Sequence, residues 1–152
     1  MITLISNHSG GLYDFRKDLI YALQKQGEIV AVVPKNDKWQ ELCSIVDKAI
    51  ELPLDRRGMN PIHDFSLFCK YRQILREIKP KLVITYTIKP NVYGGIACRM
   101  AHIPYAVNIT GLGSAIENGG LLRKFILMLY KVSLKGARVV FFENAANRDA
   151  LV

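Results

Sequence analysis

The sequence predicts one α/β domain built on a parallel sheet of six or seven strands, with helices covering both faces. Its 152 residues fit a single domain, which is large enough to bury about 70% of the surface that the unfolded chain exposes. Short apolar runs alternate with longer segments of helical period, which is the pattern of repeated β-α units. No internal repeat, low-complexity tract or linker interrupts this alternation.

Six short apolar runs are predicted to be strands. In chain order they are Ile2–Ser6, Ile29–Pro34, Lys48–Leu52, Leu82–Thr87, Tyr105–Ile109 and Val139–Glu143. Five segments between them carry apolar residues at i, i+3 and i+4 and are predicted to be helices. They are Leu12–Lys25, Lys38–Ile45, Ile62–Ile78, Asn91–Ala101 and Leu121–Leu134. Gly27, Pro80 and Pro104 support these boundaries, and Asn147–Val152 begins a further helix, as expected of a fragment of a longer protein.

The chain is basic, and its positive charge is concentrated in the middle. The net charge is +8 at pH 7, and residues 56–138 hold 14 Lys and Arg against 3 Asp and Glu, a net +11. Such a region fits an anionic partner, whether a lipid headgroup, a diphosphate or a nucleic acid, or it is a solvated basic surface. Nucleic acid is the least favoured of these because no RNP-like motif or helix-turn-helix accompanies the charge.

The cysteines predict free thiols and no metal site. Cys43, Cys69 and Cys98 form no CxxC pair and have no metal-like spacing to a histidine, so we expect buried or partly buried thiols. Their odd number, together with an N-terminus that leads directly into an apolar strand, favours a cytoplasmic protein without a signal peptide. Charged residues interrupt the longest apolar segment, Leu121–Leu134, so no segment is predicted to span a bilayer.

The segments that follow the strands are the candidate site, because ligands bind open parallel sheets beyond the carboxyl ends of the strands. After the first strand, Asn7, His8 and Ser9 precede Gly10 and Gly11. Paired glycines let the backbone approach an anion at a helix N-terminus, although a plain turn is also compatible. The segment is not GxGxxG and no Walker pattern is present, so we expect no dinucleotide or P-loop site.

The other strand ends also carry polar and basic residues. Arg56 and Arg57 suit a phosphate because each guanidinium donates two hydrogen bonds at once, although two solvated arginines are equally compatible. The further candidates are Asn60, Tyr86, Lys89, Asn91, Asn108, Thr110, Gly111 and Gly113. Helix capping alone explains Asn91 but not Lys89. No carboxylate pair or nucleophile motif stands among them, so no catalytic residue is identifiable.

Five segments, in this order, extend over nearly the whole chain: Ser9–Arg16, Arg56–Pro61, Thr85–Gly94, Asn108–Ala115 and Phe141–Asn144. Together they resemble the N-terminal domain of retaining GT-B glycosyltransferases of family 4, particularly bacterial enzymes that extend polyprenyl-diphosphate-linked sugars. The resemblance implies a Rossmann-like domain that mainly holds the saccharide acceptor. It also implies a C-terminal domain, absent from residues 1–152, that holds the nucleotide sugar.

The resemblance further implies roles for individual residues. Gly10 and Gly11 would approach the donor diphosphate across the cleft, and the other candidates at the strand ends would line the acceptor cleft. Many relatives have a histidine before Gly-Leu-Gly that contacts the donor sugar, whereas this chain has Thr110. The leaving diphosphate would assist the incoming hydroxyl with retained configuration and without a cofactor. Residues 1–152 alone are therefore expected to transfer no sugar.

A membrane contact is predicted for the segment that begins at Leu121. Arg123, Lys124, Lys131 and Lys135 occur there without an acidic residue, and three of them share one helical face by their spacing. A lipid-linked acceptor would hold the protein at the inner face of the cytoplasmic membrane, where each basic residue adds about 1 kcal/mol at an anionic surface. An ordinary core helix with a solvated basic face is the alternative.

Two other functions also fit the sequence. The first alternative is the non-catalytic, membrane-recruiting subunit of a glycosyltransferase whose halves are separate polypeptides. A GT-B-like sugar-nucleotide epimerase shares the architecture but requires acid and base residues that the sequence does not reveal. The favoured function is synthesis of a bacterial surface polysaccharide or glycan.

Overall fold

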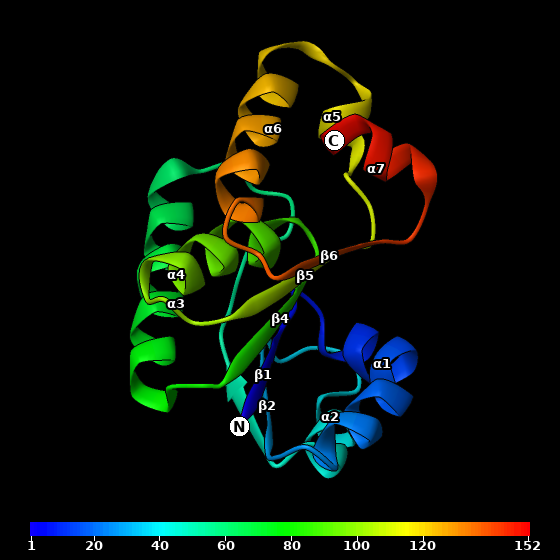
Figure 1. Ribbon diagram of the computed structural model, residues 1–152, viewed down its shortest axis with the longest axis vertical. Coiled ribbons are helices and arrows are strands. Elements are labelled where there is room, and N and C mark those ends of the chain that lie inside the picture. Colours follow the sequence, from blue (N-terminus) through cyan, green and yellow to red (C-terminus); the bar gives the residue numbers. More distant parts are fainter.

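The computed structural model describes residues 1–152, apart from the side chain of Ala115. Six parallel strands form one sheet in the order β3-β2-β1-β4-β5-β6, with helices on both faces (Figure 1). The strands are β1 (Ile2–Ile5), β2 (Ile29–Val33), β3 (Lys48–Glu51), β4 (Leu82–Tyr86), β5 (Tyr105–Ile109) and β6 (Val139–Phe142). The predicted α/β class and all six predicted strands are confirmed, and each strand ends at the predicted residue or one residue earlier.

Helices form the two outer layers. They are α1 (Ser9–Gln24), α2 (Trp39–Ile45), α3 (Pro61–Ile78), the π-helical turn η1 (Pro90–Gly94), α4 (Gly95–Met100), α5 (Ser114–Glu117), α6 (Gly120–Leu134) and α7 (Ala145–Leu151). In Figure 1, α1 and α2 lie on one side of the sheet, whereas α3, α4 and α6 lie on the other. This arrangement places the carboxyl ends of all the strands at one edge, because every strand pair is parallel.

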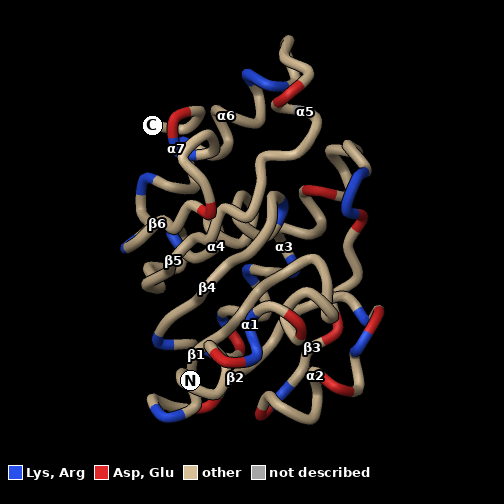
Figure 2. Tube along the Cα trace, turned by 90° about the vertical axis from the view of Figure 1, so that its right-hand side faces the viewer, with Lys and Arg blue, Asp and Glu red and all other residues tan. Residues whose placement is uncertain are grey.

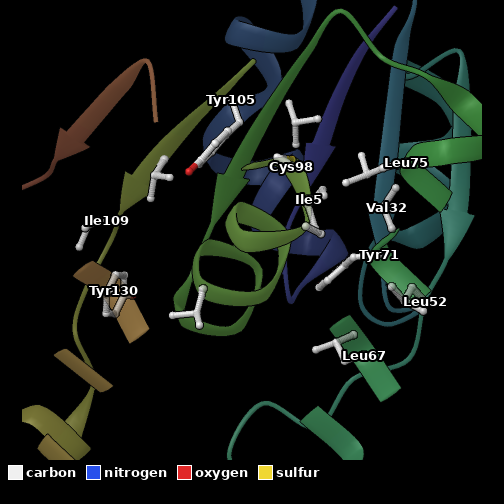
Figure 3. Packing of buried hydrophobic residues seen from close by; sticks show 14 of the residues in the cluster. Ile5, Val32, Leu52, Leu67, Tyr71, Leu75, Cys98, Tyr105, Ile109 and Tyr130 are labelled. Carbon is white, nitrogen blue, oxygen red and sulfur yellow. The ribbon is translucent and has the colours of Figure 1, made fainter. Parts of the chain in front are cut away.

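The core consists of two apolar clusters, one on each face of the sheet. Leu4 of β1 packs on one face with Ile20 of α1 and Leu42 of α2. Its neighbour Ile5 points to the opposite face, where tyrosines of α3, β5 and α6 pack around the sheet (Figure 3). The central strands β1 and β2 are buried throughout, as expected of parallel strands covered on both faces.

Three local features differ from the prediction. Helix α1 begins at Ser9 rather than Leu12, so Gly10 and Gly11 belong to its first turn and not to a loop. The predicted helix Asn91–Ala101 is a π-helical turn followed by the short helix α4. Helix α5 was not predicted at all, because four residues are too few for a periodic pattern.

The cysteine prediction is confirmed for two residues and wrong for one. Cys98 is buried and Cys43 is partly buried, whereas Cys69 is exposed. Burial raises the pKa of the Cys98 thiol to about 12, so this cysteine is inert at neutral pH. Cys69 lies on the outer side of α3, where amphipathic spacing leaves it in solvent.

The two edges of the sheet, β3 and β6, differ in the charge around them and in the side chains that they expose. Acidic residues gather in the first 55 residues, around α1, α2 and β3 (Figure 2), while the basic segment begins at Arg56. At the other edge, strand β6 leaves Val139 and Phe141 exposed on the side of α1.

Across residues 1–152, no helix has both the length and the apolar character needed to cross a membrane.

Candidate functional site

A cavity of about 530 Å³ lies at the carboxyl ends of β1, β4, β5 and β6, and we refer to it as the strand-end cavity. Six predicted site residues line it: Asn7, His8, Gly11, Arg56, Tyr86 and Thr110. They come from segments that are far apart in the sequence and that meet because parallel strands present their carboxyl ends at the same edge. The prediction that these segments converge is confirmed.

The first turn of α1 forms one wall of this cavity. His8 is extended and caps the helix, since its Nδ1 accepts a hydrogen bond of 3.0 Å from the backbone N–H of Gly11. Nε2 of His8 lies 3.8 Å from a carboxylate oxygen of the exposed Asp37, which is too far for a hydrogen bond. His8 therefore caps the first turn of α1 through Nδ1, at the wall of the cavity.

The two glycines of this turn have different surroundings. A Cβ on Gly10 would lie 3.0 Å from His8 Cε1 and 3.1 Å from the carbonyl oxygen of Asp37. Gly10 is buried, so its smallness serves close packing of α1 on the loop after β2. A Cβ on Gly11 would have no neighbour nearer than 3.7 Å, and this residue faces the cavity. Of the pair, Gly11 is the one placed to contact a ligand.

The sequence prediction missed an ion pair across the cavity mouth. Arg16 of α1 contacts Glu143, which follows β6, with Nη2 and Oε1 2.5 Å apart. The guanidinium lies 5.1 Å from the ring centroid of Tyr86, so it also makes a cation–π contact. Burial raises the pKa of Tyr86 to about 12, and the positive charge of Arg16 opposes that rise. The i, i+4 spacing from Leu12, which also lines the cavity, is the signal that would have placed Arg16 here.

A second cavity, of about 460 Å³, holds the basic residues, and we refer to it as the cationic cavity. Arg56, Arg57 and Lys89 line it, and Arg56 also lines the strand-end cavity, so the two spaces adjoin. Lys89 Nζ lies 2.8 Å from Asp64 Oδ1, and the Tyr93 hydroxyl donates to Asp64 Oδ2 at 2.9 Å. Both charged side chains are nearly buried, which makes this pair a fixed part of the cavity wall.

The loop that carries the arginines has a defined local fold. Asp55 Oδ1 accepts hydrogen bonds from the backbone N–H groups of Arg57, at 3.0 Å, and Gly58, at 2.9 Å. These N–H groups, Gly58 first, lower the pKa of the Asp55 carboxyl. A Cβ on Gly58 would lie 1.9 Å from Asp55 Oδ2, so the turn requires glycine. The arginines are thus held next to each other on a closed turn.

Several predicted site residues lie outside both cavities. They are Ser9, Gly10, Asn60, Asn91, Asn108 and Gly111. Asn60 caps α3 by accepting from the backbone N–H of Ile62, and the Ser9 hydroxyl donates to the carbonyl of Asp37. Asn91 is fully buried, and its amide donates to the carbonyl of Asn108 at 2.9 Å. The hydrogen bonds of Asn60, Ser9 and Asn91 thus stabilise segments beside the cavities, whereas Gly113, at φ +73°, lines the cationic cavity itself.

The chain matches a known family over most of its length. The family model described as "Glycosyl transferase 4-like" matches residues 1–144. The chain belongs to this family. The match includes both cavities and all five segments that carried the sequence resemblance, ending at Asn144.

Individual relatives agree with this membership. The chain is 29% identical over 154 residues to N,N'-diacetylbacillosaminyl-diphospho-undecaprenol alpha-1,3-N-acetylgalactosaminyltransferase of Campylobacter jejuni, covering 97% of this chain and 41% of that protein. The fold is similar to Acinetobacter baumannii MurG, with a TM-score of 0.64 and 14% identity over 93% of this chain and 40% of that one. A Neisseria meningitidis UDP-GlcNAc 2-epimerase gives a TM-score of 0.67 and 12% identity, covering 99% and 42%. The chain thus spans less than half the length of these proteins.

Proposed function

We propose that residues 1–152 form the acceptor side of a retaining glycosyltransferase that moves a sugar from a nucleotide-sugar donor to a polyprenyl-diphosphate-linked saccharide. The observation that carries the proposal is the joining of the strand-end and cationic cavities through Arg56. A diphosphate held by guanidiniums beside the strand ends would position its attached saccharide in the strand-end cavity. The Campylobacter relative, which is named for a diphospho-undecaprenol substrate, supports the same acceptor chemistry.

The proposed reaction needs no side chain of this chain as a base. The bond between the anomeric carbon and the donor phosphate oxygen breaks, the acceptor hydroxyl oxygen bonds to that carbon, and the hydroxyl proton passes to the leaving phosphate. Among the described residues that line the strand-end cavity, Glu143 is the one carboxylate, and Arg16 holds it. The contribution of this chain is to align the acceptor, and alignment is worth several kcal/mol of a transfer barrier.

The donor site is assigned to a C-terminal half that faces the strand-end cavity. The first turn of α1 lies at this cavity through His8 and Gly11, and the positive dipole end of the helix there favours the donor diphosphate. Gly11 would be the residue of closest approach, with Gly10 packed behind it. Neither a metal nor a cofactor is part of the proposed reaction.

We further propose that α6 contacts the inner face of the cytoplasmic membrane. The four basic residues of the prediction are all exposed: Arg123, Lys124, Lys131 and Lys135. The core side of α6 consists of Ile126, Tyr130 and Ser133, which are buried, with three partly buried leucines beside them. Five large apolar residues of the helix remain exposed: Leu121, Leu122, Phe125, Met128 and Val132. Exposed apolar residues flanked by basic ones suit an anionic bilayer surface.

A transfer assay tests the proposed function. Residues 1–152 are incubated with radiolabelled nucleotide sugars and an undecaprenyl-diphosphate saccharide, alone and with the C-terminal part of the Campylobacter relative. We expect no product from residues 1–152 alone and a lipid-linked product from the combination. Transfer by residues 1–152 alone would contradict the assignment of the donor site to the other half.

An epimerase is the second candidate that shares this fold. Similarity of fold alone does not separate the two functions, since MurG and the epimerases give nearly equal TM-scores. The sequence match to a transferase favours transfer. Release of a 2-epimerised nucleotide sugar in the same assay, without lipid-linked product, would favour the epimerase instead.

A further inference from the structure

A third cavity, of about 330 Å³, lies between α3, α4 and α6, and we refer to it as the apolar groove. Its walls are mostly large apolar side chains: Met59, Phe65, Phe68, Ile96, Phe125 and Leu129. Phe65 is 66% exposed and Phe125 is 49% exposed, and the rings of Phe65 and Phe68 lie 6.2 Å apart at 41°. Aromatic side chains that remain in water around a concave surface mark a binding site for an apolar group.

The apolar groove continues into the cationic cavity. Met59, Asp64, Tyr93, Phe125 and Leu129 line both spaces. Asp64, tied to Lys89 and Tyr93, therefore lies at the boundary between the charged and the apolar part. A single ligand would span the boundary only if it carried an anionic group directly bonded to an apolar chain.

The charge at the head of the groove is not neutralised by the protein. Arg56 and Arg57 form no ion pair with any residue that the structure describes, whereas Lys89 is paired with Asp64. The turn closed by Asp55 holds both arginines beside the cationic cavity. Two unpaired guanidiniums suit a ligand with two adjacent phosphates, each of which accepts a forked pair of hydrogen bonds.

We propose that the apolar groove and the arginine turn bind a prenyl diphosphate, with the diphosphate on Arg56 and Arg57 and the first isoprene units between α3 and α6. This inference rests on the proposed function, and it assigns recognition of the acceptor to its lipid as well as to its saccharide. The three spaces lie in the order of the parts of such an acceptor: saccharide, diphosphate and prenyl chain. Arg56, which lines the first two, lies at their junction.

The test is isothermal titration of residues 1–152 with farnesyl diphosphate below its micellar concentration, compared with inorganic diphosphate and with farnesol. We expect farnesyl diphosphate to bind at least about tenfold more tightly than either part alone, because head and tail occupy joined spaces. Equal affinity for farnesyl diphosphate and inorganic diphosphate, or no binding of farnesyl diphosphate, would overturn the proposal.

Two pairs of variants locate the binding. Phe65→Ser with Phe125→Ser removes two exposed rings and should weaken farnesyl diphosphate about tenfold while leaving inorganic diphosphate unchanged. Arg56→Gln with Arg57→Gln should weaken both ligands. The matched controls are Tyr21→Ser, an exposed ring on α1, and Lys25→Gln with Lys81→Gln, two exposed charges away from the groove. If Phe65→Ser with Phe125→Ser bound farnesyl diphosphate as tightly as the wild type, the proposal would be overturned.

A membrane-inserted surface is the competing explanation of the exposed rings. Sedimentation with phosphatidylglycerol vesicles that contain no prenyl lipid measures it directly. If Phe65→Ser with Phe125→Ser abolished vesicle binding but left farnesyl diphosphate affinity intact, the groove would be a membrane contact and the proposal would be wrong. The transfer assay separates this proposal from the proposed function. If it gave lipid-linked product while both variant pairs bound farnesyl diphosphate as tightly as wild type, the prenyl site in the groove would be wrong and the transferase function would still hold.

Discussion

Strands β1 and β6 belong to the same parallel sheet and have the same length, yet their surroundings differ. Every residue of β1 is buried between α1 and α2 on one face and α3 and α4 on the other. In β6, Val140 and Phe142 pack on the core, while Val139 and Phe141 remain exposed. The comparison teaches that a central strand contributes both of its faces to the core, whereas the edge strand β6 contributes one face and leaves the other uncovered.

The largest expected effect is a loss of stability, and it appears when one substitution in β1 is compared with one in β6. Leu4→Ala in β1 removes a fully buried side chain and should lower the free energy of unfolding by about 2–5 kcal/mol. Phe141→Ala in β6 removes a larger side chain that is 53% exposed, and it should cost less than about 1 kcal/mol. Urea unfolding measures both values. Equal losses for the two variants would show that β6 is as much a part of the core as β1.

A pair of glycine substitutions extends the comparison from the strands to the helices and loops. A Cβ on Gly95 would lie 2.3 Å from Ser133 Oγ and 3.3 Å from Tyr105 Cε2, so Gly95→Ala should cost about 1–3 kcal/mol through overpacking between α4 and α6. A Cβ on Gly111 meets nothing within 4 Å, so Gly111→Ala should change stability by less than about 0.5 kcal/mol. Similar unfolding midpoints for the two variants would contradict the close packing of α6 on α4.

The basic side of α6 gives an effect on binding rather than on stability. Lys124→Glu with Lys131→Glu should weaken sedimentation with anionic liposomes at low salt by roughly tenfold or more, since each basic residue contributes about 1 kcal/mol. Lys25→Glu with Lys81→Glu reverses the same number of exposed charges elsewhere and serves as the control. Equal loss in both variants would assign the binding to overall charge and not to α6.

The smallest expected effect is the titration of the arginine turn. The backbone N–H groups of Gly58 and Arg57 lower the pKa of Asp55, so the turn is favoured above the unfolded pKa and is lost as the pH falls through the folded pKa. The amide NMR shifts of Arg57 and Gly58 should therefore change with a midpoint below 3.8, the ordinary value for this group. Asp55→Asn, which keeps the acceptor oxygen but does not titrate, should abolish the transition. A titration midpoint above pH 3.8 would contradict the hydrogen bonds from Arg57 and Gly58 to the Asp55 carboxylate.

Local sequence patterns were sufficient to predict the strands but not the start of α1. Short apolar runs located all six strands within one residue, because strands covered on both faces admit few polar residues. Gly10 and Gly11 have low helix propensity, and the first turn of α1 is held by the cap from His8 and by the hydrogen bond from the Ser9 hydroxyl to the Asp37 carbonyl. Those contacts come from the fold and are invisible in a local pattern.

The site was predicted where it follows from strand order and missed where it depends on long-range contacts. Asn7, Tyr86 and Thr110 reach one cavity because each lies at the carboxyl end of a parallel strand. Arg16 and Glu143 are separated by 127 positions, so no spacing rule pairs them. Asn91 was expected at the cleft, but its amide has a buried partner in Asn108, and a polar residue with such a partner belongs to the scaffold.

The most direct test of the acceptor-side assignment is the ratio of two affinities measured on residues 1–152. The first affinity is that for a short-chain prenyl-diphosphate-linked N-acetyl sugar. The second is that for a nucleotide sugar, and it is measured for each nucleotide sugar of a panel. The account predicts that the prenyl-linked saccharide binds at least about tenfold more tightly than any nucleotide sugar, because the proposed function gives the acceptor to the cavities of residues 1–152 and the donor to another part of the enzyme. A nucleotide sugar that binds more tightly than the prenyl-linked saccharide would contradict it.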